Sequence, residues 1–123
     1  MFTSRPIAQA LLRAKTNGVN IEILCDKSQL KEQYSVIPML KKNGIAVYVD
    51  KVQGLSHNKI LIIDEKIVFT GSYNFTKAAN TRNAENLLFI KSPALAQRYL
   101  KEWQYRFNNQ KRTLNIPLKK FIL

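Results

Sequence analysis

A single histidine followed closely by a lysine is the feature of this sequence best suited to chemistry. His57 is the only histidine in the 123 residues, and Lys59 stands two positions later, where the apolar run of residues 60–63 begins. Residues two apart on an extended strand point to the same face, so we expect the two side chains to emerge side by side. An imidazole beside a fixed ammonium group is suited to attack on an anionic centre.

Cleavage of a phosphodiester is one reaction that such a pair supports. It needs a nucleophile for the phosphorus, cationic or hydrogen-bonding groups for the non-bridging oxygens, and an acid for the leaving oxygen. Histidine can serve as the nucleophile or as the acid because its pKa lies near neutrality. Lys59 is the candidate charge clamp, and Ser72 and Asn74 offer neutral donors directly after Gly71, which lets the chain approach closely.

The other ionisable residues narrow the chemistry. Glu85 is the candidate carboxylate for orienting the imidazole, with an ion pair to Arg82 or Lys77 as the alternative. Cys25 is the only cysteine and lies in an apolar stretch, so we expect a small buried side chain rather than a reactive thiol. Carboxylates do not cluster in the sequence, and we therefore expect neither a metal site nor a cofactor.

The chain is strongly basic, with 20 Lys and Arg against 8 Asp and Glu, a net charge of +12. This excess favours a polyanionic partner: nucleic acid first, with DNA ahead of RNA, and an anionic lipid surface second. Charge that serves only solubility is the alternative. No apolar run approaches the roughly 20 residues of a membrane span, so we expect no stable membrane insertion. Residues 1–6 carry no secretory signal, which predicts a cytoplasmic protein unless a signal is encoded upstream.

The length of the chain predicts one domain, which we place at residues 1–109, followed by a basic and apolar tail at residues 110–123. The first predicted helix begins after Thr3 or Ser4 and ends at Asn17 and Gly18. The second covers residues 36–42 after a Ser35 cap. The third opens at Pro93 and carries a stripe that we expect to be core: Leu95, Tyr99, Trp103 and Phe107.

The predicted strands alternate with these helices in the first half of the chain and follow one another in the second. They cover residues 19–25, 45–49, 58–64, 67–70 and 84–90, with a tight reversal at residues 65–66. The strand–helix–strand order predicts an α/β fold with a mixed, mostly parallel sheet flanked by helices.

The pattern His57-x-Lys59-x4-Asp64-x6-Gly71-Ser72 resembles the HKD signature of the phospholipase D superfamily. The continuation through residues 71–79 and 83–86 resembles the small bacterial Nuc-type endonucleases, which carry one motif per chain. The resemblance covers most of residues 2–109 and implies the phospholipase D/nuclease-like fold. Family members usually have a further strand before the segment that matches residues 2–4. The resemblance therefore implies a domain that is truncated at its amino terminus and lacks the family's first strand.

The resemblance also implies roles for the site residues. His57 would be the nucleophile that forms a phosphohistidine, and Lys59, Ser72 and Asn74 would bind the phosphate. Glu85 would accept a hydrogen bond from the imidazole. One histidine cannot be nucleophile and leaving-group acid at once. The resemblance implies a homodimer about a two-fold axis, in which each active site contains His57 from both subunits, one as the nucleophile and the other as the acid.

The remaining motif residues are expected to act around this centre. Asp64 lies seven positions from His57, an odd offset that turns its side chain to the opposite face of a strand. We therefore expect Asp64 to have a structural role, and we expect the same of Gly71. Lys77 and Arg82 are expected to contact the substrate backbone or solvent. The predicted function is a metal-independent phosphodiesterase acting on nucleic acid. The alternatives are a phospholipid phosphodiesterase of the same superfamily and a non-catalytic basic module that binds nucleic acid.

Overall fold

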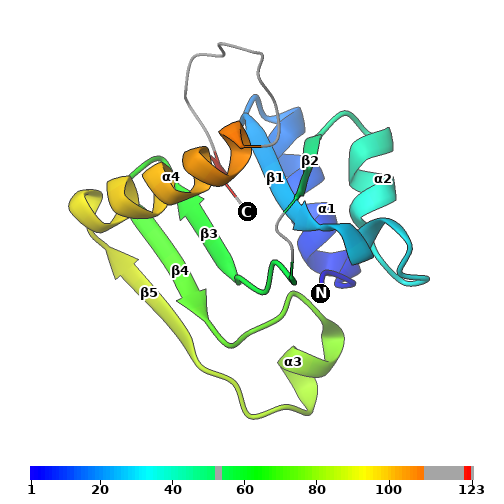
Figure 1. Ribbon diagram of the computed structural model, residues 1–123. Helices are drawn as coiled ribbons and strands as arrows, with labels where there is room; N and C mark the ends of the chain where they lie inside the picture. Colours follow the sequence, from blue (N-terminus) through cyan, green and yellow to red (C-terminus); the bar gives the residue numbers. More distant parts are fainter. Residues whose placement is uncertain (52–53, 110–120, 123) are drawn as a thin grey trace.

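A six-stranded sheet runs through the part of the chain that the computed structural model describes, which is residues 1–51, 54–109 and the backbone of 121–122 (Figure 1). In the order in which they lie side by side, the strands are β2 (Ala46–Asp50), β1 (Ile21–Asp26), β6 (Phe121–Ile122), β3 (Ile60–Ile63), β4 (Ile67–Gly71) and β5 (Leu87–Lys91). β1 is parallel to β2 and β6, whereas β3 is antiparallel to β6 and β4, and β4 to β5. The predicted α/β fold with a mixed sheet is confirmed.

The prediction of a mostly parallel sheet is wrong, because among the described strands β1 and β2 are the only pair that is both consecutive in sequence and parallel. α2 (Ile37–Lys42) carries the chain from β1 to β2, and these strands are therefore parallel. A tight turn of three residues joins β3 to β4, with Asp64 and Glu65 at φ of 50° and 56° and the Lys66 N–H donating to the Ile63 carbonyl at 3.0 Å. The chain reverses again through α3 (Lys77–Thr81), and of the five described pairings three are antiparallel.

Serine hydroxyls accept hydrogen bonds at the starts of three helices, and the sequence predicts two of them, Ser4 and Ser35. The Ser4 side chain accepts a hydrogen bond from the backbone of the first turn of α1 (Arg5–Thr16), and Ser92 does the same for α4 (Pro93–Asn108). Ser35 Oγ accepts from the Ile37 N–H at 3.2 Å at the start of α2. A short 3₁₀ helix, η1 (Lys27–Leu30), follows β1. Among the described helices, none combines the length and apolar character that a bilayer crossing needs.

Two apolar clusters lie on opposite faces of the sheet. Val47 and Val49 of β2 pack into the cluster beneath α1 and α2, whereas Tyr48 between them contacts Phe107 of α4. Because alternate residues of a strand point to opposite faces, α4 covers the face that α1 and α2 do not. The first cluster consists of Phe2, Ala8, Ile21, Ile23, Cys25, Val36, Ile37, Leu40 and Ile45, and the second of Ile62, Val68, Ala96 and Leu100.

Two sequence predictions are confirmed by these clusters. Cys25 is buried in the first cluster. Tyr99 and Trp103 pack against the second, and Phe107 stacks on Trp103 with ring centroids 5.2 Å apart. The aromatic stripe of α4 is therefore core and not a stacking surface for bases.

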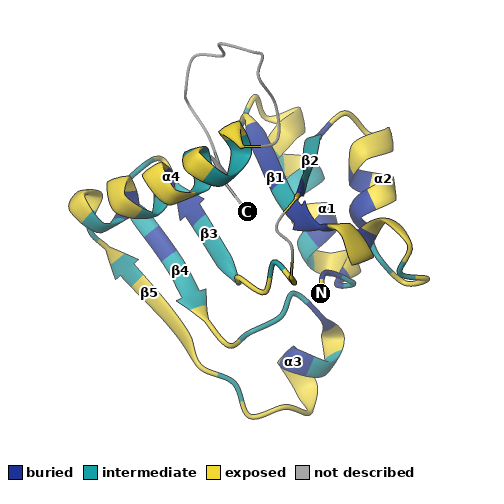
Figure 2. Cartoon of the chain, in the orientation of Figure 1, coloured by how far each residue is buried: buried dark blue, intermediate teal, exposed yellow. Residues whose placement is uncertain are grey.

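The face of β3, β4 and β5 that points away from α4 belongs to neither cluster among the described residues. Leu61, Phe69 and Phe89 lie in register across it, and the two rings contact edge to face at 5.0 Å. Phe89 is 60% exposed and Leu87 is 50% exposed on the same strand. Figure 2 shows β5 exposed along most of its length. We call these four side chains the β5 apolar face.

Candidate active site

His57 and Lys59 lie in an unpaired segment that leads into β3. The predicted strand of residues 58–64 is shorter in the structure, where β3 begins at Ile60. The Lys59 Nζ donates a hydrogen bond to the carbonyl of His57 at 2.8 Å, so the ammonium group is held against the histidine backbone. The His57 side chain is exposed. Burial lowers the pKa of Lys59, and the negative charge of Glu85 opposes that change.

Ser72 and Glu85 face each other across the ends of β4 and β5. Ser72 Oγ donates to Glu85 Oε2 at 2.5 Å, and Asn83 Nδ2 donates to Glu85 Oε1 at 2.9 Å. Hydrogen bonds from Ser72 first and Asn83 second, together with the charge of Lys59, lower the pKa of Glu85. An ionised carboxylate, a hydroxyl and an ammonium group therefore gather at this end of the sheet. Asn83 stands two residues before Glu85 and was not among the predicted site residues.

Gly71 makes the approach of Ser72 to β5 possible. A Cβ added at Gly71, where φ is +156°, would lie 2.0 Å from the carbonyl oxygen of Asn86. Ser72 and Asn86 are joined by two further hydrogen bonds, from the Ser72 N–H to the Asn86 carbonyl and from the Asn86 N–H to Ser72 Oγ, each at 3.0 Å. Asp64 lies in the hairpin turn, at the opposite end of β3 from His57.

The structure does not join every predicted site residue. Within the described residues, no hydrogen bond links the His57 imidazole to Glu85 or to another side chain. Asn74 Oδ1 accepts a hydrogen bond from the amino group of Met1 at 3.0 Å. Lys77 begins α3 and Arg82 follows its last residue, and both side chains are exposed. No group of three or more His, Cys, Asp or Glu that could hold a metal ion occurs in the described part of the chain.

The candidate site lies on an open surface. A cavity of about 250 Å³ between β1, β3 and α4 is lined in part by Ser56 and Lys59, but His57, Ser72 and Glu85 lie outside it. Lys59 therefore contacts both the cavity and the surface, whereas His57 and Ser72 are exposed and are reached from the surface.

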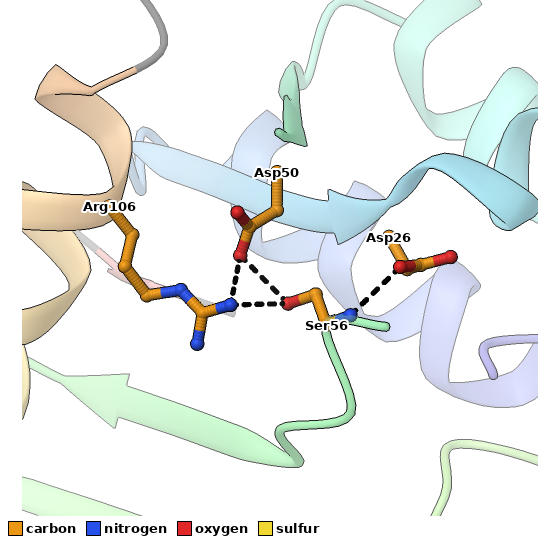
Figure 3. A network of polar contacts seen from close by, with 4 residues as sticks. All are labelled: Asp26, Asp50, Ser56 and Arg106. Atoms are coloured by element: carbon orange, nitrogen blue, oxygen red, sulfur yellow. Dashed lines mark hydrogen bonds and ion pairs between the residues drawn. The ribbon is translucent and has the colours of Figure 1, made fainter. Parts of the chain in front are cut away.

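A second polar cluster lies beside His57 and was missed from the sequence (Figure 3). It joins Ser56 to Asp26 and Asp50, the last residues of β1 and β2, and to Arg106 of α4. One signal was available, because the two aspartates end neighbouring parallel strands, and the carboxyl ends of such strands meet at one edge of a sheet.

An α/β domain with a His-x-Lys pair before a hairpin and a Gly-Ser pair after it is of the phospholipase D class. Residues 1–107 match the family model described as "Cardiolipin synthase, PLD-like domain", and the chain belongs to this family. The resemblance to the phospholipase D superfamily is confirmed.

Known proteins of this class are similar to most of the chain. The protein named phospholipase D from Rickettsia conorii is 48% identical over 100 residues, which are 81% of this chain and 50% of that protein. A mitochondrial cardiolipin hydrolase from Chlamydomonas reinhardtii is 35% identical over 94 residues, 76% of this chain and 42% of that one. The chain therefore spans about half the length of these relatives. The crystal structure of Nuc from Salmonella typhimurium, a phospholipase D family member, has a TM-score of 0.81 and 39% identity, covering 87% of this chain and 72% of Nuc.

Proposed function

We propose that this protein is a metal-independent phosphodiesterase that hydrolyses nucleic acid through a phosphohistidine at His57. The observation that carries the proposal is the group formed by Lys59 and the Ser72–Glu85 pair next to the histidine segment. The imidazole attacks phosphorus, a P–N bond forms, and the P–O bond to the leaving group breaks. Water then hydrolyses the P–N bond and frees the imidazole. This chemistry requires no Lewis acid.

The neighbouring groups have distinct roles in this proposal. Lys59, Ser72 and Asn74 bind the non-bridging oxygens of the phosphate, where negative charge develops. Glu85 is ionised at neutral pH, and the hydrogen bonds that lower its pKa keep it ionised in acidic solution as well, so it can accept a hydrogen bond from the imidazole once the site is assembled.

The leaving oxygen needs a proton while His57 is the nucleophile, and a second His57 from another copy of the chain supplies it. The β5 apolar face is the surface that we assign to this two-fold contact. It is apolar, its Leu87 and Phe89 are exposed, and it continues from the strand ends that carry Ser72 and Glu85. Exposed apolar side chains that lie in register are unusual on a monomer and mark contact surfaces.

The net charge of +12 and the open surface of the site favour a long polyanionic substrate. Lys77 and Arg82 are exposed, and they lie between Ser72 and Glu85 in the sequence. We assign them to contacts with the substrate backbone. The second candidate function is hydrolysis of a phospholipid, which the names of the relatives favour: phospholipase D and mitochondrial cardiolipin hydrolase.

Parallel assays on plasmid DNA, single-stranded RNA and cardiolipin vesicles test the proposal. Cleavage of nucleic acid is expected to continue in EDTA, to stop in His57→Ala, and to fall steeply as salt rises, because released counterions drive binding to a polyanion. Cleavage that requires magnesium contradicts the mechanism. Turnover of vesicles without cleavage of nucleic acid selects the lipid substrate. Binding of DNA with no turnover of either substrate leaves only the binding module.

A further inference from the structure

We propose that Ser56 is a positioning residue for His57, held in place by a partly buried network with Asp26, Asp50 and Arg106. The proposal rests on the proposed function, in which His57 is the nucleophile. It concerns how the backbone that carries this nucleophile is held in place, which the hydrogen bond proposed between the imidazole and Glu85 does not explain.

Ser56 uses both its backbone and its side chain in this network (Figure 3). Its N–H donates to Asp26 Oδ2 at 2.8 Å, and its hydroxyl donates to Asp50 Oδ2 at 2.8 Å. The Arg106 Nη2 donates to Ser56 Oγ at 3.2 Å and forms an ion pair with Asp50 Oδ2 at 2.5 Å. One loop residue is thereby tied to β1, β2 and α4 at once.

The network is built from groups that a protein buries only with partners. Asp26 and Asp50 are 8% and 4% exposed, and they are opposite each other in the register of β1 and β2. Two neighbouring carboxylates repel each other, and the Arg106 guanidinium compensates for this at Asp50. The cluster therefore has defined distances and charges, unlike a chance set of polar groups on a surface loop.

The contacts of Ser56 restrain His57 because the two residues are adjacent. The segment before β3 has no strand partner among the described residues, so no ladder of backbone hydrogen bonds fixes the histidine. The hydrogen bond from the Ser56 N–H to Asp26 fixes the chain just before His57, and the hydrogen bond from Lys59 Nζ to the His57 carbonyl fixes it just after. A nucleophile held between two anchors keeps its line of attack, whereas one on a free loop samples many directions.

The role of Ser56 is tested by removing its hydroxyl alone. Ser56→Ala keeps the N–H that binds Asp26 and the ion pair of Arg106 with Asp50, so the fold should persist. Using a phosphodiester with a nitrophenolate leaving group, we expect kcat to fall about tenfold with KM within about twofold, since misplacement of a reacting group lowers the rate and not the binding. Ser56→Thr retains the hydroxyl and should recover kcat to within about threefold of the wild-type value.

Ser92→Ala is the matched control. It removes one serine hydroxyl that caps α4, a structural hydrogen bond remote from His57 in the chain. It should lower the melting temperature without changing kcat. The proposal is overturned if Ser56→Ala has the kcat of Ser92→Ala at a similar loss of stability.

A readout without turnover separates this proposal from the proposed function. His57 is the only histidine, so the Hε1 proton of its imidazole gives one assignable NMR signal in the full chain. That signal should move in Ser56→Ala and stay in place in Ser92→Ala. If the wild-type protein hydrolyses no phosphodiester, the proposed function fails, and the NMR signal alone decides the positioning role. An unchanged signal in Ser56→Ala then overturns it.

Discussion

Gly71→Ala should destabilise the protein by several kcal/mol, because the added methyl group meets the backbone of Asn86 and Leu87. The added Cβ would lie 2.0 Å from the Asn86 carbonyl oxygen, 2.8 Å from its carbon and 3.2 Å from the Leu87 Cα. Carbon and oxygen atoms normally stay about 3.3 Å apart or more, so β4 and β5 must separate here by about 1.3 Å. All three obstructing atoms are backbone atoms, and no side chain can rotate away to make room.

The cost follows from what this separation breaks. Two hydrogen bonds between Ser72 and Asn86 are lost, each worth about 1 kcal/mol, and strain of overpacking adds about 1–3 kcal/mol. The free energy of unfolding should therefore fall by about 3–5 kcal/mol, and the melting temperature by about 15 °C for a chain of this length. The shift also withdraws Ser72 from Glu85, so phosphodiesterase activity should be lost even at temperatures where the variant is folded.

Urea denaturation followed by circular dichroism measures this loss. Gly54→Ala is the matched control, because a Cβ at Gly54 meets nothing within 4 Å. It should change the free energy of unfolding by less than about 0.5 kcal/mol, as surface substitutions usually do. The reasoning is refuted if Gly71→Ala unfolds within about 1 kcal/mol of Gly54→Ala.

Three further predictions concern charge, reactivity and assembly. Burial tends to raise the pKa of Asp26, but hydrogen bonds from Ser28 and from the Ser56 N–H outweigh it and bring the pKa below its usual 3.8. The ionised carboxylate therefore stabilises the fold above that pH. Asp26→Asn should therefore lower the urea midpoint at pH 7, with a gap to wild type that narrows as pH falls below 3.8; a constant gap contradicts this. Burial raises the pKa of Cys25 from 9.0 to about 11, so iodoacetamide at about pH 8 should alkylate the native protein about a hundredfold more slowly than the urea-unfolded chain, and equal rates would show an accessible thiolate. Phe89→Lys should convert the proposed dimer to a monomer, as measured by analytical ultracentrifugation. Tyr34→Lys is the control, because Tyr34 is an exposed aromatic residue outside the β5 apolar face, and this variant should remain a dimer. Equal masses for both variants contradict the assigned interface.

Local patterns in the sequence were sufficient for the main helices and strands. Ser4 and Ser92 cap α1 and α4, Ser35 accepts a hydrogen bond from the first residue of α2, and β1 to β5 are the apolar or alternating runs. η1 and α3 were missed because four or five residues are too few to show a helical period. Thr76, which caps α3 by accepting from the Ala79 N–H, was the one local signal. Within the tail predicted at residues 110–123, Phe121–Ile122 forms β6, while residues 110–120 and 123 lie outside the described residues.

The candidate site was predictable only where its residues follow a fixed spacing. His57, Lys59, Gly71 and Ser72 belong to one motif, and the structure does bring Lys59 near the Ser72–Glu85 pair. The Ser56 contacts depend on tertiary structure, because Asp26 and Arg106 lie 30 and 50 residues away in the chain. Hydrophobic periodicity and residue propensities describe neighbours in the sequence, so they cannot predict a contact between residues so far apart.

A physical requirement connects the motif to this second cluster. The segment carrying His57 must remain unpaired if the imidazole is to face a substrate, but an unpaired segment has no strand ladder to fix its backbone. Strand ends solve this problem, since the last residues of β1 and β2 are rigid, adjacent and free to turn acidic side chains toward the loop. Arg106 supplies the opposite charge from α4, which is itself fixed by its packing on β3 and β4. Ser56 is small enough to donate its N–H to one carboxylate and its hydroxyl to the other, so the loop gains order without losing its exposed face.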